Sequence, residues 1–117
     1  MKNVTIYHNP RCSKSRETLA LLEQHGVQPQ IILYLETPPS VDQLKKLLKA
    51  LGFSSARELM RQKEDLYKEL KLADETLSED QLLKALVENP KLIERPIVVQ
   101  GNKARIGRPP EQVLEII

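Results

Sequence analysis

The spacing of apolar residues changes twice along the chain, from strand-like at the start to helical in the middle and back to strand-like near the end. VTIY at residues 4 to 7 alternates as a short strand does, and a helical stripe follows over about residues 14 to 25. Gly26 then stands where the C-terminal cap of a helix is expected. IILYL at residues 31 to 35 predicts a buried strand. Because a helical crossover returns the chain in the same direction, these two strands are expected to be parallel neighbours.

The middle of the chain, about residues 40 to 90, is expected to be helical throughout. Three serines there precede a glutamine or glutamate by three residues, the spacing of a capping box at a helix start: Ser40, Ser55 and Ser78. Leucines at helical spacing follow the first and the last of these serines, and Gly52 and Pro90 mark where those two helices end. A short last helix is expected to open at Pro109 and to run to Ile117.

The stretch IVVQGNKARI, residues 97 to 106, predicts a β-hairpin whose two loop residues are Gly101 and Asn102. Gln100 would then face Lys103, and every further pair outward from the loop follows from this register. The hairpin therefore predicts which side chains meet at its open end.

Counting outward from the loop places Arg95 opposite Arg108, and both residues precede a proline, which favours extended backbone. Two guanidinium groups would project together from the open end of the hairpin. They repel one another unless something negative lies between them, so the pair predicts an anion site. The alternative is that each arginine pairs with a neighbouring carboxylate, that of Glu94 or Glu111.

The only cysteine, Cys12, stands between the first strand and the first helix, next to Arg11, Lys14 and Arg16. A thiol at a helix N-terminus meets the positive end of the helix dipole and unpaired backbone N–H groups, and both favour the thiolate. The same donors can bind an oxyanion. Side chains that can add hydrogen bonds are those of His8, Ser13 and Ser15. We therefore expect a reactive thiolate, the alternative being a buried structural cysteine that packs as a small hydrophobe.

Composition limits the classes of function that remain. A chain of 117 residues suits one domain, and its net charge of +2 comes from charges of mixed sign, so no nucleic-acid partner is indicated. No apolar run approaches the roughly 20 residues that span a bilayer, and no signal peptide is recognisable, so no membrane partner is expected. One cysteine cannot form an internal disulfide, which agrees with a cytoplasmic location. Cys12 and two histidines, His8 and His25, lack the number and spacing of a zinc site.

Redox domains of the thioredoxin type carry C-x-x-C between their first strand and first helix. This chain has Cys12-Ser13-Lys14-Ser15 there, with serine in place of the second cysteine, so dithiol chemistry within the chain is excluded.

Five segments together carry a family resemblance: IYHNPRCSKSR at 6 to 16, ILYLETPP at 32 to 39, RELMRQKEDLYKEL at 57 to 70, ERPIVV at 94 to 99 and RIGRPPEQVLEI at 105 to 116. In this order they make the chain resemble the arsenate reductases of the glutaredoxin-coupled family, most closely a chromosomally encoded bacterial branch. The resemblance implies an α/β fold with a thioredoxin-like mixed sheet, in a single domain of residues 1–117. It also implies a helical insertion at about residues 40–90, between the second and third strands, and a cis peptide bond between Arg95 and Pro96.

Roles for individual residues also follow from the resemblance. The nucleophile of the family matches Cys12, the histidine that activates this cysteine matches His8, and the serine at the helix start matches Ser15. The oxyanion-binding arginines of the family match three positions: Arg61, Arg95 and Arg108. Arg57 lies one helical turn before Arg61, so the residues alone leave open which of the two serves, or whether both are solvated.

The activity that the resemblance implies is reduction of arsenate, or of a similar oxyanion, to arsenite by attack of the Cys12 thiolate. Glutathione would act as co-substrate and a glutaredoxin would complete the cycle, with no bound cofactor and no metal. Unlike the plasmid-borne members, this chain has charged residues at Arg11 and Lys14, and it stops at Ile117 without their C-terminal extension. The charges should strengthen anion binding, whereas the missing extension leaves glutaredoxin docking open.

Two other classes of function stay open on the sequence alone. One is a monothiol redox protein that handles glutathione mixed disulfides, which the C-x-x-S run permits but which does not require three arginines. The other is a non-enzymatic regulator of the same fold that binds RNA polymerase. Such regulators typically sense redox state through C-x-x-C, which this chain lacks.

Overall fold

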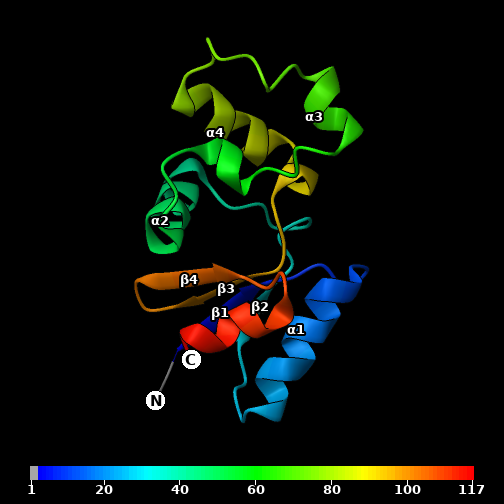
Figure 1. Cartoon of the computed structure of the whole chain (residues 1–117), viewed down its shortest axis with the longest axis vertical. Helices are drawn as coiled ribbons and strands as arrows, with labels where there is room; N and C mark the ends of the chain where they lie inside the picture. Colours follow the sequence, from blue (N-terminus) through cyan, green and yellow to red (C-terminus); the bar gives the residue numbers. More distant parts are fainter. Residues whose placement is uncertain (1–2) are drawn as a thin grey trace. The chain divides into compact units, whose positions relative to one another are not determined.

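A computed structural model describes residues 3–117, which fall into two units along the chain (Figure 1). The first unit combines the segment up to Thr37 with Arg95–Ile117, and the second is Pro38–Glu94. The single domain expected for residues 1–117 stays a prediction.

The first unit is built on a mixed sheet of four strands in the spatial order β2-β1-β3-β4. Strands β1 and β2 are parallel and are connected by helix α1, as predicted, whereas β1 pairs with β3 and β3 with β4 in antiparallel fashion. The bounds of these elements are β1 Val4–Tyr7, α1 Ser13–Gln24, β2 Gln30–Ile32, β3 Ile97–Gln100 and β4 Lys103–Ile106. The predicted α/β fold with a thioredoxin-like mixed sheet, and with helices inserted between its second and third strands, is confirmed.

The predicted register of the hairpin is also confirmed. Gln100 faces Lys103 across the β3–β4 turn, and Ile97 faces Ile106. A backbone hydrogen bond of 2.9 Å from the N–H of Gly107 to the carbonyl of Pro96 continues the same register one pair further. The peptide bond between Arg95 and Pro96 is cis, as the resemblance implies, and so is the bond between Arg108 and Pro109.

The second strand is shorter and more exposed than predicted. Strand β2 ends at Ile32, and the chain then turns, with the N–H groups of Glu36 and Thr37 both 2.9 Å from the carbonyl of Leu33. Ile31 keeps 48% of its surface exposed because β2 lies at the edge of the sheet, with a single neighbouring strand. The prediction of a buried strand over residues 31 to 35 is therefore wrong.

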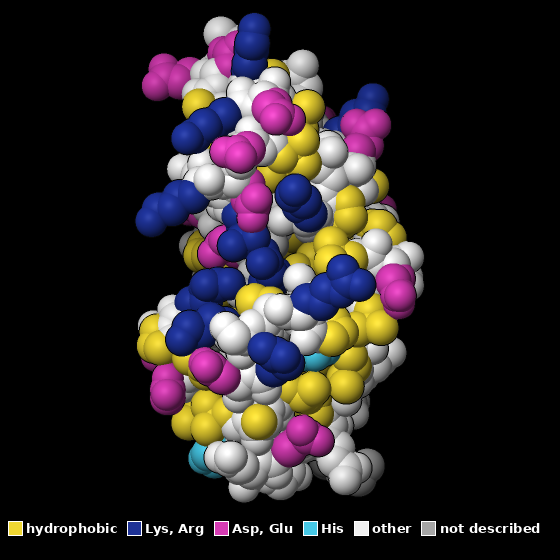
Figure 2. Space-filling model, turned by 90° about the vertical axis from the view of Figure 1, so that its right-hand side faces the viewer, with side chains coloured by type: hydrophobic (Ala, Val, Ile, Leu, Met, Phe, Trp, Pro, Cys, Tyr) yellow, Lys and Arg dark blue, Asp and Glu magenta, His cyan; other side chains and the backbone are white. Residues whose placement is uncertain are grey.

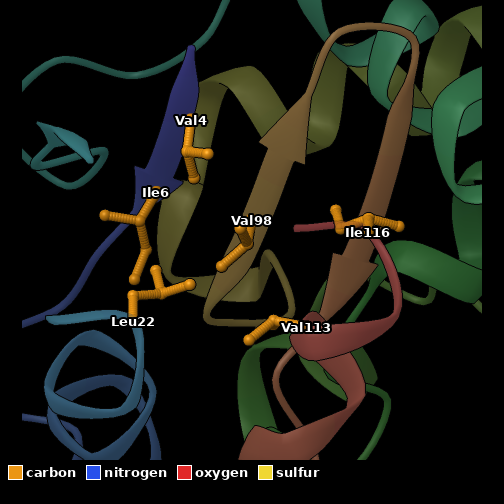
Figure 3. Packing of buried hydrophobic residues seen from close by; sticks show 6 residues of the cluster. All are labelled: Val4, Ile6, Leu22, Val98, Val113 and Ile116. Atoms are coloured by element: carbon orange, nitrogen blue, oxygen red, sulfur yellow. The ribbon is translucent and has the colours of Figure 1, made fainter. Parts of the chain in front are cut away.

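One face of the sheet carries the core of this unit, which Figure 3 shows from close by. Ile6 and Val98 face one another on neighbouring strands, and Leu22 of α1 packs against them. Val113 of η3 (Pro110–Glu115) completes this layer. This last helix is a short 3-10 helix that ends at Glu115, so the prediction of a helix that runs to Ile117 is wrong. Full burial of a leucine or isoleucine side chain contributes about 1.5–3 kcal/mol, so this layer fixes α1 on the sheet.

The second unit contains helices α2 (Val41–Leu51), η1 (Ala56–Leu59), α3 (Asp65–Glu69), α4 (Glu79–Glu88) and η2 (Pro90–Leu92). All three predicted capping boxes are present. The box at Ser55, however, starts only the single 3-10 turn of η1. An antiparallel bridge between Met60 and Ile93 follows, so this region is not helical throughout as predicted.

Charged side chains of both signs lie at the surface. On the face shown in Figure 2, aspartate and glutamate side chains lie among those of lysine and arginine, with apolar patches between them. Within residues 3–117, no helix combines the length and the apolar character needed to cross a membrane.

Candidate active site around Cys12

Cys12 is the N-cap residue of α1, at the position where the sequence predicts a helix start. Its backbone carbonyl accepts the first helical hydrogen bond, from the N–H of Arg16 at 3.0 Å. Its own N–H donates to the carbonyl of Asn9 at 3.0 Å, which closes the loop between β1 and α1. The residue is partly exposed, and the backbone N–H groups of Lys14 and Ser15 in the first helical turn point to its sulfur.

Several groups act on the ionisation of the Cys12 thiol. Burial by itself raises its pKa, but the backbone N–H groups of Ser15 and Lys14 and the positive charges of Arg95 and Arg108 together outweigh this effect. The pKa of Cys12 therefore lies below its ordinary value, as predicted for a thiol at a helix N-terminus.

The cations that lower this pKa come from the other end of the chain, Arg95 and Arg108. The sequence had instead pointed to the neighbours of Cys12. One of these, Lys14, directs its ammonium to the carboxylate of Glu17 at 3.4 Å, in an exposed ion pair.

Arg108 contacts the sulfur directly. Its Nη2 atom donates to Sγ of Cys12 at 3.6 Å, and its Nε donates to the backbone carbonyl of Arg95 at 2.7 Å. The hairpin register thus brings Arg95 and Arg108 together at the open end of the hairpin, beside the thiol of Cys12.

Arg95 and Arg108 also lack acidic partners. No carboxylate within residues 3–117 forms an ion pair with either guanidinium group, and Glu94 pairs with Arg61 instead. The Nε atom of Arg95 is buried without a hydrogen-bond partner among the described residues. A buried donor without an acceptor costs about 1–3 kcal/mol, so an anion that accepts from Arg95 would recover that energy. The alternative that each arginine pairs with Glu94 or Glu111 is wrong.

His8 and Ser15 form a buried pair beneath the loop. Nδ1 of His8 lies 2.7 Å from Oγ of Ser15, and the backbone N–H of Asn9 donates to the same hydroxyl at 3.0 Å. Burial lowers the pKa of His8, which keeps the imidazole neutral at neutral pH. This pair connects the end of β1 to the first turn of α1 and so fixes the loop that carries Cys12.

A close approach between Gly107 and Thr18 holds α1 against the end of β4. A Cβ atom added at Gly107 would lie 2.4 Å from Oγ1 of Thr18 and 2.9 Å from Cγ of Pro96. Thr18 is fully buried, and its hydroxyl donates to the carbonyl of Lys14 at 2.8 Å. Sequence reasoning missed this contact, although a glycine directly before Arg108 was a signal that could have suggested it.

Arg61 belongs to the second unit, where two carboxylates hold its guanidinium. It forms a hydrogen-bonded ion pair with Glu64, and its Nε lies 3.7 Å from Oε1 of Glu94. Its backbone N–H donates to the carbonyl of Leu92 at 2.7 Å, next to the bridge between Met60 and Ile93.

Arg57 has a different environment, which separates it from Arg61. Its Nε donates to the carbonyl of Leu72 at 3.0 Å, and its Nη2 donates to the carbonyl of Asp74. The guanidinium of Arg57 thus contacts the backbone that follows α3, whereas that of Arg61 contacts carboxylates.

Comparisons with known proteins give a consistent result. A model of the ArsC family matches residues 7–116. The chain is 71% identical over 116 residues to the uncharacterized protein YfgD of Escherichia coli strain K12, covering 99% of this chain and 98% of that protein. It is 57% identical over 115 residues to an arsenate reductase of Haemophilus influenzae, covering 98% and 99%. The solved structure of an arsenate reductase from Vibrio cholerae superposes with a TM-score of 0.97 at 64% identity, covering 99% of this chain and 98% of that one.

Proposed function

Because the chain belongs to the ArsC family, we propose that it is an arsenate reductase, an oxidoreductase that uses Cys12 as its nucleophile and external thiols as its reductant. One observation carries the proposal. The guanidinium group of Arg108 contacts the Cys12 thiol and also donates to the backbone carbonyl of Arg95. Neither arginine has a carboxylate partner among residues 3–117.

Arsenate binds where these positive charges meet the start of α1. Arg95 and Arg108 donate to the oxygen atoms of the anion, and the N–H groups of the first helical turn add uncharged donors. Charge-assisted hydrogen bonds of this kind contribute about 1.5–3 kcal/mol each. Arg61 is the third proposed ligand, on the strength of the family resemblance, and its guanidinium is oriented by Glu64 and Glu94.

The first chemical step is attack of the Cys12 thiolate on arsenic. A bond forms between Sγ and arsenic, one arsenate oxygen leaves as water after taking up protons, and arsenic stays in its pentavalent state. The lowered pKa of Cys12 increases the fraction of thiolate over that of an ordinary cysteine, and the arginines offset the repulsion between two anions.

The second step reduces arsenic. A glutathione thiolate attacks Sγ of Cys12, the S–S bond forms as the S–As bond breaks, and the electron pair of the broken bond remains on arsenic, which leaves as arsenite. A glutaredoxin then reduces the mixed disulfide by thiol–disulfide exchange and restores Cys12. Both thiols must come from outside because the chain has one cysteine. We place this cycle in the cytoplasm, where such thiols stay reduced.

His8 and Ser15 act as positioning residues in this scheme. The hydrogen bond of His8 goes to Ser15, which is also the residue whose backbone N–H stabilises the thiolate. The two residues therefore act on Cys12 indirectly, because they fix the conformation of the loop that carries it.

Two assays on the same protein distinguish this function from that of a monothiol redox protein. One measures arsenate-dependent oxidation of glutathione with a glutaredoxin present. The other measures reduction of the mixed disulfide between glutathione and 2-mercaptoethanol without arsenate. We expect activity in the first assay that is lost in Cys12→Ser. Activity in the second assay alone would contradict the proposal.

A further inference from the structure

Asn9 is bonded to the loop between β1 and α1 at three different atoms. Its backbone carbonyl accepts from the N–H of Cys12 at 3.0 Å, and its side-chain Oδ1 accepts from the N–H of Arg11 at 3.0 Å. Its own N–H donates to Oγ of Ser15 at 3.0 Å. The hydrogen bonds of this one residue therefore reach the chain before Cys12, at Cys12 and after it.

The first two of these hydrogen bonds form a turn that the local sequence favours. Asn9 is the first residue of the turn, Pro10 the second and Cys12 the fourth. Asparagine at the first position and proline at the second are typical of a β-turn. An asparagine side chain can also accept from the N–H two residues further on, and here that N–H belongs to Arg11. The accepting atom is Oδ1, because the amide nitrogen of asparagine can only donate.

The turn also separates the N–H groups around Cys12 into two sets. Those of Arg11 and Cys12 itself are used by Asn9 and fix the conformation of the loop. Those of Lys14 and Ser15, in the first turn of α1, are left for the sulfur and stabilise the thiolate. The direction in which the chain leaves the turn thus decides whether the sulfur meets the second set.

The third hydrogen bond connects the turn to one of the N–H groups that act on the sulfur. Asn9 donates to the hydroxyl of Ser15, and the backbone N–H of the same serine bonds to the thiolate of Cys12. Ser15 is fully buried, and its Oγ also lies 2.7 Å from Nδ1 of His8. Because Ser15 is held in place, a rotation of the turn at Asn9 changes the distance between its N–H and the sulfur.

We propose that Asn9 is a positioning residue for the proposed reaction, and that its side chain holds the sulfur of Cys12 where the N–H groups of α1 converge on it. The hydrogen bonds of Asn9 within residues 3–117 go to Arg11, Cys12 and Ser15, so it acts through the loop and not by contact with the sulfur. The inference rests on the proposed function, which makes Cys12 the nucleophile, and adds a residue to its site.

The test measures the rate at which iodoacetamide alkylates Cys12 as a function of pH, which reports the pKa of the thiol. Asn9→Ala should shift the profile to higher pH and lower the rate near pH 6.5 by about threefold, in line with the loss of one ordinary hydrogen bond. Asn9→Ser should recover most of that rate, because a serine hydroxyl can accept from the N–H of Arg11 in the same way. A wild-type profile in Asn9→Ala, or a serine variant no faster than the alanine variant, would overturn the inference.

Asn89→Ala is the matched control for a loss of stability alone. The side-chain amide of Asn89 donates to the backbone carbonyl of Ala85 at 3.0 Å, in the second unit of the chain. Its removal should lower the midpoint of urea denaturation and leave the alkylation profile unchanged. An equal shift of the profile in Asn89→Ala would also overturn the inference, because the thiol would then respond to stability in general.

Failure of this inference can be told from failure of the proposed function, since alkylation needs no arsenate. Arsenite production by the wild type together with an unchanged profile in Asn9→Ala would remove the role of Asn9 but leave the reductase. A shifted profile in Asn9→Ala, with a wild type that makes no arsenite, would do the reverse.

Discussion

The Nη2 atom of Arg108 lies 3.6 Å from the Sγ atom of Cys12, although 96 residues separate them in the chain. The β3–β4 hairpin returns Arg108 to the start of α1, and its Nε is tied to the carbonyl of Arg95 at 2.7 Å. The proposed nucleophile thus lies beside two arginines that have no carboxylate partner within residues 3–117.

Replacement of Arg108 should raise the pKa of Cys12. Arg108→Gln removes a positive charge that stabilises the thiolate, so ultraviolet titration of the thiolate absorbance should reach its midpoint at higher pH than in the wild type. The wild-type midpoint should itself lie below that of the same thiol in denaturant. Equal midpoints in the folded and denatured protein would remove the argument for activation.

The shape of the arginine side chains should matter as well as their charge. Arg95→Lys or Arg108→Lys keeps the charge but loses the bidentate fork, so sulfate or arsenate affinity should fall at least tenfold, which is about 1.4 kcal/mol. Isothermal titration calorimetry measures this affinity. Arg105→Lys is the matched control, since Arg105 lies in the same hairpin but pairs with Glu115. Unchanged affinity in both site variants would contradict a shared oxyanion site.

The contact between Gly107 and Thr18 should be intolerant of a methyl group. Gly107→Ala places that group 2.4 Å from Oγ1 of Thr18, and such overpacking costs about 1–3 kcal/mol of unfolding free energy. The adjustment should also separate Cys12 from Arg108 and raise the thiol pKa. Gly101→Ala is the comparison, because its φ of 61° makes alanine strained there while the surrounding space is open. It should lose stability in chemical denaturation without a change in the thiol pKa.

Burial of His8 should make the protein less stable in mild acid. Its pKa is lowered by burial, so below about pH 6.5 the unfolded chain binds a proton that the folded chain does not. The free energy of unfolding should therefore decrease as the pH falls through this window, and His8 should contribute no slope above it. Urea denaturation from pH 7.5 to 5.5 tests this.

Two histidine variants complete that experiment. His8→Gln should show a smaller decrease on acidification than the wild type. His25→Gln should keep the wild-type decrease, because His25 is exposed at the end of α1. A wild-type decrease that survives in His8→Gln would assign the effect to another group.

The sequence was most informative where structure is decided locally. A two-residue turn at Gly101 and Asn102 sets the hairpin register, and this register places Arg95 beside Arg108. A serine followed three residues later by glutamine or glutamate sets a helix start in the same way, as at Ser40. These features need only a few neighbouring residues, so they could be predicted.

Features that depend on distant contacts were not predictable in this way. The capping box at Ser55 fixes where η1 begins but not its length, which is set by the bridge between Met60 and Ile93. Arg57 and Arg61 look alike in the sequence, where both are expected on one helix, but Arg61 lies beyond the end of η1, and their backbone and carboxylate partners differ. An apolar run such as residues 31 to 35 also does not reveal that its strand lies at a sheet edge.

Steady-state arsenite production, with each component omitted in turn, tests the central claim most directly. Reduction of arsenate takes two electrons, and Cys12 has no second cysteine in the chain with which to form a disulfide. We therefore predict that protein and arsenate alone are inert, that glutathione produces a mixed disulfide at Cys12, and that sustained arsenite release also needs a glutaredoxin. Multiple turnovers without any added thiol, or no arsenite with every component present, would contradict the account.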